Sequence, residues 1–348
     1  MSDHAHDTHH DEHHHELGFL RKYVFSTDHK VIGLQYGLTG LAFLFFGFML
    51  MLVMRWQIAH PGEAVPLVGK LLHAVFGTHA FSQDALGRMG MLTNDGYNSF
   101  GAMHGTIMVF FGIVPAAFAA FGNYVVPLQI GAPDMTFPRI NMASFWCFYI
   151  SCIFMLVSFF VPGGSAKSGW TSYPPLSGIA DSFAADPKFA WDHFFNGQTL
   201  WISGMVFNIT ASLLGSVNFI ATIIQLRAPG MTWMRLPFFV WAQFITAFLL
   251  LLAFPPLEAA GVMHLMDRAF GSSFFMPTGL VVNGQLTDWA GGGSPVLWQH
   301  LFWFLAHPEV YVLILPGIGI VAEVIACNTR KPLYGYKAMV GAIFTLAL

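Results

Sequence analysis

The sequence predicts an all-α protein, a polytopic bundle of transmembrane helices. Of its 348 residues, 55% are hydrophobic and only 9% are charged, whereas soluble domains carry about 25% charged residues. Six apolar runs are each long enough to cross about 30 Å of hydrocarbon, and lipid admits only helices or closed barrels. No strand-like alternation favours a barrel. The six runs span residues 31–54, 101–121, 142–162, 200–226, 236–262 and 298–326.

The parts of the chain outside these runs complete the predicted organisation. Residues 1–25 are predicted to be a disordered, histidine-rich tail before a transmembrane domain at 26–348. The tail can be a metal scavenger or merely a solvated terminus, and the second interpretation is favoured. The first apolar run is too long for a signal peptide, so it is a retained span. A seventh run begins near residue 337. The three cysteines form no CxxC pair, which favours neither a disulfide framework nor a thiolate metal site.

The distribution of Lys and Arg predicts that the N-terminus faces the cytoplasm. With that orientation the basic residues are concentrated in short inside segments, as the positive-inside rule requires, and residues 56–97, 163–198 and 264–297 are external loops. The inside residues are Arg21, Lys22, Lys30, Arg139, Arg227, Arg235, Arg330, Lys331 and Lys337. The outside residues are Arg55, Lys70, Arg88, Lys167, Lys188 and Arg268.

The sixth apolar run contains an imidazole, a carboxyl group and a phenol within five residues. His307 lies about 15 Å deep, near the bilayer midplane, at about 1.5 Å of rise per residue. Residues four apart share a helix face, so Tyr311 is predicted to be its neighbour while Glu309 points elsewhere. Pro308 removes a backbone hydrogen bond and loosens the preceding turn. Ionisable groups in a span mark functional sites because each costs a few kcal/mol to insert. A cluster that only ties helices together is the alternative.

The second apolar run contains His104, about 10 Å inside its outer end. Its small neighbours Gly101, Ala102 and Gly105 would let a flat macrocycle approach closely. A single histidine is a common axial ligand of haem, but a hydrogen-bonded packing histidine fits the same pattern.

An inner loop between the second and third runs carries Asp134. Asn123 and Asn141 lie at the flanking helix ends. A carboxylate at a pore mouth with amides above it can collect protons and pass them along ordered water. Pairing of Asp134 with the nearby Arg139 explains the same spacing equally well.

Several long motifs carry a resemblance to a known family. They are STDHKVIG (26–33), MHGTIMVFF, GNYVVPLQIGAPDMTFPR, GWTSYPPL (169–176), VNFIATII (217–224) and QHLFWFLAHPEVYVLILPG (299–317). Together they resemble subunit I of the haem–copper oxidases, the group typified by mitochondrial-type cytochrome c oxidase. The resemblance implies a bacterial inner-membrane enzyme, surrounded by lipid, that reduces O2 to water with electrons from cytochrome c and pumps protons. It further implies two haems of the A type, a copper B ion, a copper A-bearing subunit II and a subunit III, and no nucleic acid.

The resemblance implies roles for four residues near the low-spin haem. His104 matches an axial ligand of the haem iron. Arg55 and Tyr97 match groups that hydrogen-bond the haem substituents. Trp170 and the loop after it match the region above the haem propionates.

The resemblance also implies roles in the oxygen chemistry and in proton transfer. His307 matches one of three histidine ligands of copper B, and Tyr311 matches the tyrosine covalently joined to it, a pair that supplies an electron and a proton when the O–O bond breaks. Asp134 matches the entrance of the D proton channel, and Glu309 matches the buried acid at its branch point. The channel lining matches Asn123, Asn141, Tyr36 and Ser212.

Some positions depart from the family pattern. A glutamate of an outer cation site is Gln57 here, so we expect no calcium or sodium there. One of two neighbouring channel serines is Ala211, and Glu258 matches no family role. No histidine follows His307, although the family needs further copper and haem ligands. We therefore expect this chain to be the N-terminal part of a twelve-span subunit, inactive alone.

Four other functions compete with this one. In a quinol oxidase a His and a Gln flank the position of Tyr97, but Gly96 and Ser99 stand there, which favours cytochrome c as donor. Tyr311 and the Asp134 motif argue against a nitric oxide reductase. A proton channel without redox chemistry would need neither His104 nor Tyr311. An inert assembly piece is the remaining alternative.

Overall fold

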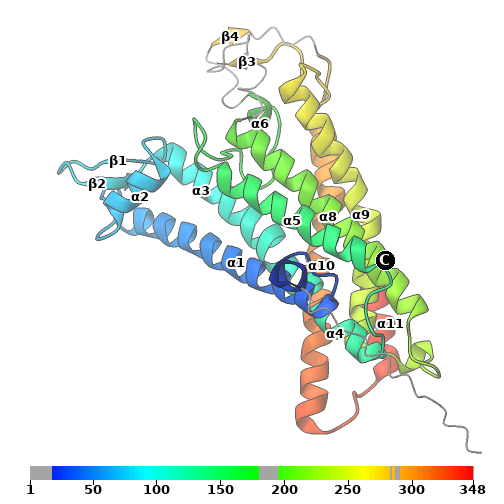
Figure 1. Ribbon diagram of the computed structural model, residues 1–348. Coiled ribbons are helices and arrows are strands. Elements are labelled where there is room, and N and C mark those ends of the chain that lie inside the picture. Colours follow the sequence, from blue (N-terminus) through cyan, green and yellow to red (C-terminus); the bar gives the residue numbers. More distant parts are fainter. Residues whose placement is uncertain (1–17, 180–194, 283, 287–290, 348) are drawn as a thin grey trace, which may run out of the picture.

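The computed structural model describes residues 18–179, 195–282, 284–286 and 291–347. In this part of the chain, long helices lie side by side, with short strands confined to one end (Figure 1). Six helices or helix series are long and apolar enough to cross a membrane, which confirms the predicted fold class. They are α1 (His29–Ala59), the series Asn94–Ile130, α5 (Pro138–Val157), α8 (Gly197–Gln225), α9 (Phe238–Ala269) and α10 (Pro295–Thr329).

Each helix extends beyond its predicted apolar run at one or both ends, although α5 ends at Val157, before the predicted residue 162. The second is the longest extension, from the predicted 101–121 to Asn94–Ile130. Hydropathy marks only the part that suits hydrocarbon, whereas backbone hydrogen bonding continues a helix into polar sequence until a cap ends it. The Thr93 side chain caps this helix by accepting from the Gly96 amide at 2.9 Å.

The second span is not a uniform α-helix. It consists of α3 (Asn94–Thr106), two π-helical segments η2 (Ile107–Ile113) and η3 (Pro115–Ala120), and α4 (Phe121–Ile130). Pro115 lacks an N–H, so the ordinary helical hydrogen bond cannot form there. Wide helical turns of this kind are frequent at functional sites, and the first of these two segments begins at Ile107, three residues after His104.

Small residues let α1 pack closely on the second span. A Cβ added at Gly33 would lie 3.0 Å from the Ala120 carbonyl oxygen, and one at Gly40 would lie 3.1 Å from that of Gly112. Such close approach gains dispersion contact between spans, where the hydrophobic effect gives no drive for association. Farther along the bundle α8 packs on both α5 and α9, and α10 packs on α9.

The connections lie at the two ends of the bundle. One end holds α2 (Gly69–Phe76), the antiparallel pair β1 (Phe81–Gln83) and β2 (Met89–Leu92), α6 (Leu176–Ile179), and the pair β3 (Val281–Val282) and β4 (Gln285–Leu286) (Figure 1). The other end holds η4 (Trp233–Arg235) and the turn before α11 (Tyr336–Ala347). Residues 1–17 of the predicted tail lie outside the described residues, while its Leu20–Val24 forms the helical turn η1.

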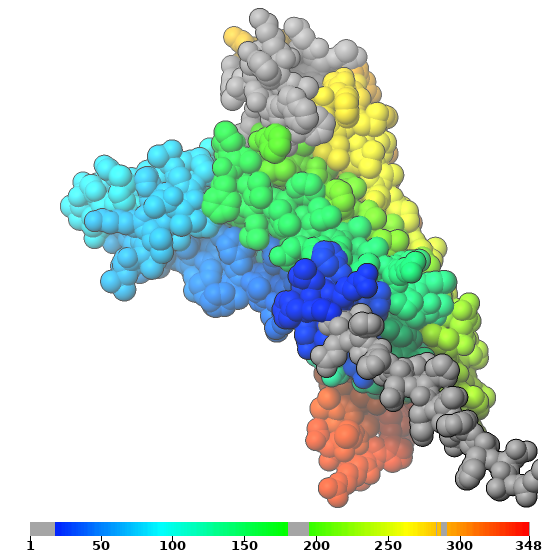
Figure 2. Space-filling view, in the orientation of Figure 1, coloured from blue at the N-terminus to red at the C-terminus, as the bar shows by residue number. Residues whose placement is uncertain are grey.

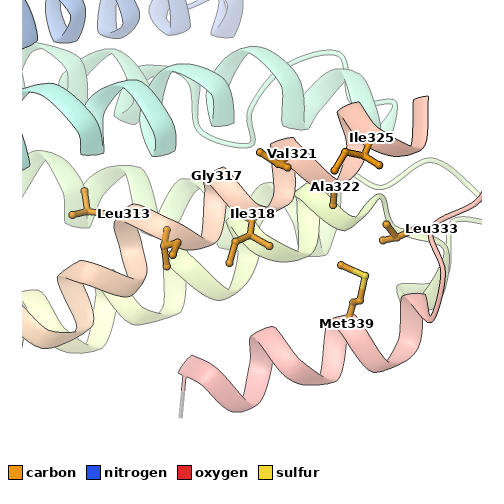
Figure 3. Close-up of a pocket in the computed structure, with 9 residues that line it drawn as sticks. Leu313, Gly317, Ile318, Val321, Ala322, Ile325, Leu333 and Met339 are labelled. Atoms are coloured by element: carbon orange, nitrogen blue, oxygen red, sulfur yellow. The ribbon is translucent and has the colours of Figure 1, made fainter. Parts of the chain in front are cut away.

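The end of α10 and the following α11 project from the bundle (Figure 2). Between them lies a groove of about 570 Å³ lined entirely by apolar side chains of α10, α11 and the turn that joins them (Figure 3). Leu313, Gly317 and Val321 come from α10, and Met339 faces them from α11. In the described chain this apolar surface is therefore only partly covered.

Candidate functional site

The three groups predicted in the sixth span point to two sides of α10. The His307 Nε2 atom lies 3.1 Å from the Tyr311 hydroxyl, and the two rings meet edge to face with centroids 4.8 Å apart. Glu309 is buried, with 2% of its surface exposed. Both of its carboxyl oxygens lack a hydrogen-bond partner in the described chain. The geometry predicted from residue spacing is therefore present.

The face of α10 that carries His307 is otherwise apolar and uncovered. His307 is exposed, and the side chains one turn before and two turns after it, Phe304 and Ile314, are 59% and 52% exposed. Glu309 belongs instead to the buried stripe that packs on α9 and η3, with Leu305 and Val312 beside it along the helix. One helix thus separates an exposed imidazole and its half-buried phenol partner from a buried acid.

His104 is held by a single hydrogen bond to a neighbouring span. Its Nδ1 atom lies 2.9 Å from the Gly47 carbonyl oxygen of α1. A carbonyl only accepts, so Nδ1 carries the proton and Nε2 keeps its lone pair. Histidines that bind metals are commonly oriented in this way through the other ring nitrogen. His104 therefore has the tautomer that an axial ligand requires.

The loop after Trp170 connects the surroundings of His104 to α10. Trp170 packs on Gly105, where an added Cβ would lie 2.9 Å from the Trp170 Cβ. Its ring also meets Phe302 edge to face at 5.4 Å. The Trp298 indole N–H donates to the Thr171 carbonyl oxygen at 2.9 Å. The loop at Trp170 thus contacts both the second span and α10, which are far apart in the sequence.

The other predicted haem-side residues lie between His104 and the end of the bundle that holds α2 and the β1–β2 pair. Tyr97 is two turns before His104 on the same helix and packs partly buried against the core. Arg55 lies on α1, two turns beyond Gly47, and is exposed. The Arg55 guanidinium forms no ion pair with any described residue.

Three of the predicted channel residues line one cavity between α1, the second span, α5 and α8. Its volume is about 20 Å³, which is enough for one water molecule. The Tyr36 hydroxyl lies 2.7 Å from Ser144 Oγ, which donates to the Ala211 carbonyl oxygen at 2.8 Å. The predicted residues on this cavity are Tyr36, Asn123 and Ser212.

The sequence interpretation missed two polar residues of this cavity, Ser144 and Asn208. Ser144 could have been found, because it follows Asn141 by three residues and therefore shares its helix face. Asn141 itself is buried, with an amide nitrogen that lacks a partner in the described chain, but it does not line this cavity. Asp134 and Glu309 do not line it either.

Asp134 lies in the turn between α4 and α5, at the end of the bundle opposite to the one that holds α2 and the β1–β2 pair. Its Oδ1 atom accepts from the Met135 amide at 2.6 Å. Partial burial raises the pKa of Asp134 above its ordinary value, and His29 at the start of α1 acts on it in the opposite sense. No ion pair joins Asp134 to Arg139 among the described residues, so the alternative pairing is absent there.

Neither histidine lies in a complete metal site within the described residues. No group of three or more His, Cys, Asp or Glu side chains comes together there. His104 and His307 can each supply one protein ligand, and any further ligand must come from elsewhere.

Comparison with known proteins agrees with this geometry. Residues 31–348 match the family model described as cytochrome c and quinol oxidase polypeptide I. The alternative cytochrome c oxidase subunit 1 of Bradyrhizobium diazoefficiens is 40% identical over 332 residues, which cover 95% of this chain and 50% of the relative. Cytochrome c oxidase subunit 1 of Thermostichus vulcanus is 40% identical over 317 residues, 91% of this chain and 48% of the relative.

These matches and the six apolar helices define an integral membrane protein of the oxidase polypeptide I class. The chain belongs to the family of haem–copper oxidase subunit I. The chain spans about half the length of the curated relatives it matches.

Proposed function

We propose that the full-length subunit reduces O2 to water with electrons from cytochrome c and moves protons across a bacterial inner membrane, with its N-terminus in the cytoplasm. It would act together with a copper A-bearing subunit II and a subunit III. The observation that carries the proposal is the division of α10 between the His307–Tyr311 pair on one side and the buried Glu309 on the other.

We propose two haems of the A type and copper B as cofactors, and the residues present fit one protein ligand of a low-spin haem and one of copper B. His104 would bind the iron of a low-spin haem through its Nε2 lone pair. At His307 the Nε2 atom is engaged by Tyr311, which leaves Nδ1 for copper. Arg55, Tyr97 and Trp170 would hold the haem substituents. When bound, the metals supply electrons and the site where O2 is reduced.

The chain's own groups supply protons to that site. The Tyr311 hydroxyl holds a proton beside His307, at the atom from which oxygen chemistry can take it. Glu309 receives protons on the opposite side of α10. Its two unpartnered oxygens leave the carboxyl free to bind and pass on a proton.

A path to Glu309 would begin at Asp134. Its raised pKa lets the carboxyl take up protons closer to neutral pH. Above it, Asn123, Asn141 and the water-sized cavity at Tyr36 and Ser212 would carry the proton through ordered water.

The surroundings of Tyr97 favour cytochrome c over a quinol as electron donor. Ser99 is buried and hydrogen-bonded to Ser165. A Cβ at Gly96 would lie 2.4 Å from the Ala80 carbonyl oxygen. These positions therefore offer a quinol no free polar group and no space.

The purified full-length complex should contain haem and copper. A reduced-minus-oxidised spectrum is expected to show the bands of two A-type haems, and metal analysis should find iron and copper. Oxygen consumption should follow added reduced cytochrome c. Absence of haem bands or of copper would contradict the oxidase, and turnover with quinol alone would replace cytochrome c as donor.

Replacing Asp134 with Asn should slow proton uptake without removing the haems. Turnover is expected to fall on the order of tenfold, less than for a group in direct proton transfer, because water still reaches the inner mouth. The matched control is Asp95→Asn at the opposite end of the second span, where Asp95 pairs with Lys167 at 3.1 Å. Proton release from proteoliposomes during turnover measures the effect. Equal rates in the two variants would exclude Asp134 as the entrance.

A further inference from the structure

The α9 helix carries a second acid within the membrane that the proposed oxidase function does not use. Glu258 lies about 16 Å from the outer end of α9 at about 1.5 Å per residue. Its Oε1 atom lies 2.6 Å from the Thr210 hydroxyl on α8. Its Oε2 atom is buried and has no partner in the described chain. The carboxyl group is therefore turned inward between two spans.

The hydrogen-bond donors and acceptors around Thr210 favour a protonated Glu258 carboxyl group. The Thr210 hydroxyl has one proton and two acceptors within reach, the Val206 carbonyl oxygen at 2.9 Å and Glu258 Oε1. If Glu258 carries a proton on Oε1, it donates to Thr210, and Thr210 donates to Val206. Every proton then has an acceptor, and the 2.6 Å separation suits an O–H···O hydrogen bond.

No neighbouring positive charge among the described residues would stabilise an ionised Glu258 carboxylate. Among the described residues no Lys, Arg or His forms an ion pair with it. The neighbouring titratable group is Cys147 of α5, which is close enough to interact electrostatically but supplies no positive charge. An ionised carboxylate with one unpartnered oxygen is strongly disfavoured between spans.

The α9 helix lacks two backbone hydrogen bonds in the turn before this acid. Pro255 and Pro256 lack an N–H, so the carbonyl oxygens of Leu251 and Leu252 lose their helical partners. Side chains on a helix lean toward its N-terminus, so the carboxyl of Glu258 leans toward this turn. Freed carbonyl oxygens near a carboxylic acid are acceptors for its proton or for a bridging water.

We propose that Glu258 and Thr210 form a second proton-binding site within the membrane, with the proton held between Glu258 Oε1 and Thr210 Oγ1. The site is separate from the water-sized cavity, which takes Ser212 from α8 but neither of these two residues. Its ligand is a proton, and its neutral form is the resting form.

Infrared spectroscopy of the full-length oxidase complex in lipid nanodiscs tests this site. A neutral carboxylic acid gives a C=O band that moves in D2O, whereas a carboxylate gives none in that region. The Glu258 band is expected to disappear in Glu258→Gln. It should shift to higher wavenumber in Thr210→Val, which removes the hydrogen bond, and stay in place in the matched control Thr210→Ser. The Glu309→Gln variant separates the two acids, because it should leave the Glu258 band intact.

Labelling with a hydrophobic carbodiimide gives an independent measurement. The reagent adds to neutral carboxylic acids in apolar surroundings: the acid oxygen bonds to the carbodiimide carbon, and the proton moves to nitrogen. Mass spectrometry should find the adduct on the α9 peptide and lose it in Glu258→Gln.

Two results would overturn the proposal: no band lost in Glu258→Gln, or a Glu258 band unmoved in Thr210→Val. If Glu258→Gln does not accumulate, the two Thr210 variants still decide the matter. Haem spectra of the same samples report the oxidase assignment separately, so the two can fail independently.

Discussion

Glu309→Gln is expected to lower oxygen consumption by roughly 10²–10⁴-fold, the range that a positioned proton-transfer group contributes. Glutamine keeps the size of the side chain but cannot bind and release a proton. No other described group hydrogen-bonds this carboxyl and could take over its role. The haem bands should remain unchanged, because His104 and the α10 face that carries His307 are not touched. Oxygen electrode measurements with reduced cytochrome c give the rate.

The control for this substitution is Glu63→Gln. Glu63 lies in the loop after α1, 4.0 Å from Arg88, with its side chain 53% exposed. The same chemical change there should leave turnover at the wild-type level. Unaltered turnover and pumping in Glu309→Gln would show that protons reach the oxygen chemistry by another route.

Local neighbours in this protein could be predicted from residue spacing alone. The pairing of His307 with Tyr311 and the separate direction of Glu309 follow from helix periodicity, which Pro308 loosens but does not abolish. The six spans likewise follow from hydropathy, because hydrocarbon imposes a length that few soluble elements reach.

Contacts between spans could not be predicted in this way. The spans are apolar on all sides, since lipid and protein interior are equally apolar, so hydropathy does not tell the buried side from the lipid side. The cavity at Tyr36 needs α1, the second span, α5 and α8 together, and Asn208 was therefore missed, whereas Ser144 had a local signal in its spacing from Asn141. The contact of Trp170 with both Gly105 and Phe302 is of the same kind.

The structure of the loop before the second span also could not be predicted from the sequence. It was predicted only as an external loop, yet it folds into α2 and the β1–β2 hairpin. These elements are three to eight residues long, too short for a clear period. Their arrangement depends on long-range fits, such as Gly90 against Gly69, where an added Cβ would lie 2.2 Å from the Gly69 Cα.

Tyr311→Phe removes one oxygen atom and with it the hydrogen bond to His307. Turnover is expected to fall by roughly 10²-fold or more, because the proton held beside the imidazole is lost while the ring still packs. Haem content should stay at the wild-type level, since His104 is unaffected. Copper should be largely retained, since His307 keeps Nδ1 as a ligand atom. Oxygen consumption, pyridine haemochrome spectra and metal analysis measure the three quantities.

The matched control is Tyr334→Phe, in the turn before α11, where the side chain is 96% exposed. It loses the same atom without a hydrogen-bond partner in the described chain and should behave as wild type. If Tyr311→Phe also kept full turnover, the phenol would serve only to orient His307, and the exposed face of α10 would contribute a metal ligand but no proton. Loss of copper together with turnover would instead indicate that the hydrogen bond fixes the imidazole for metal binding, because His307 then cannot hold its ring orientation without Tyr311.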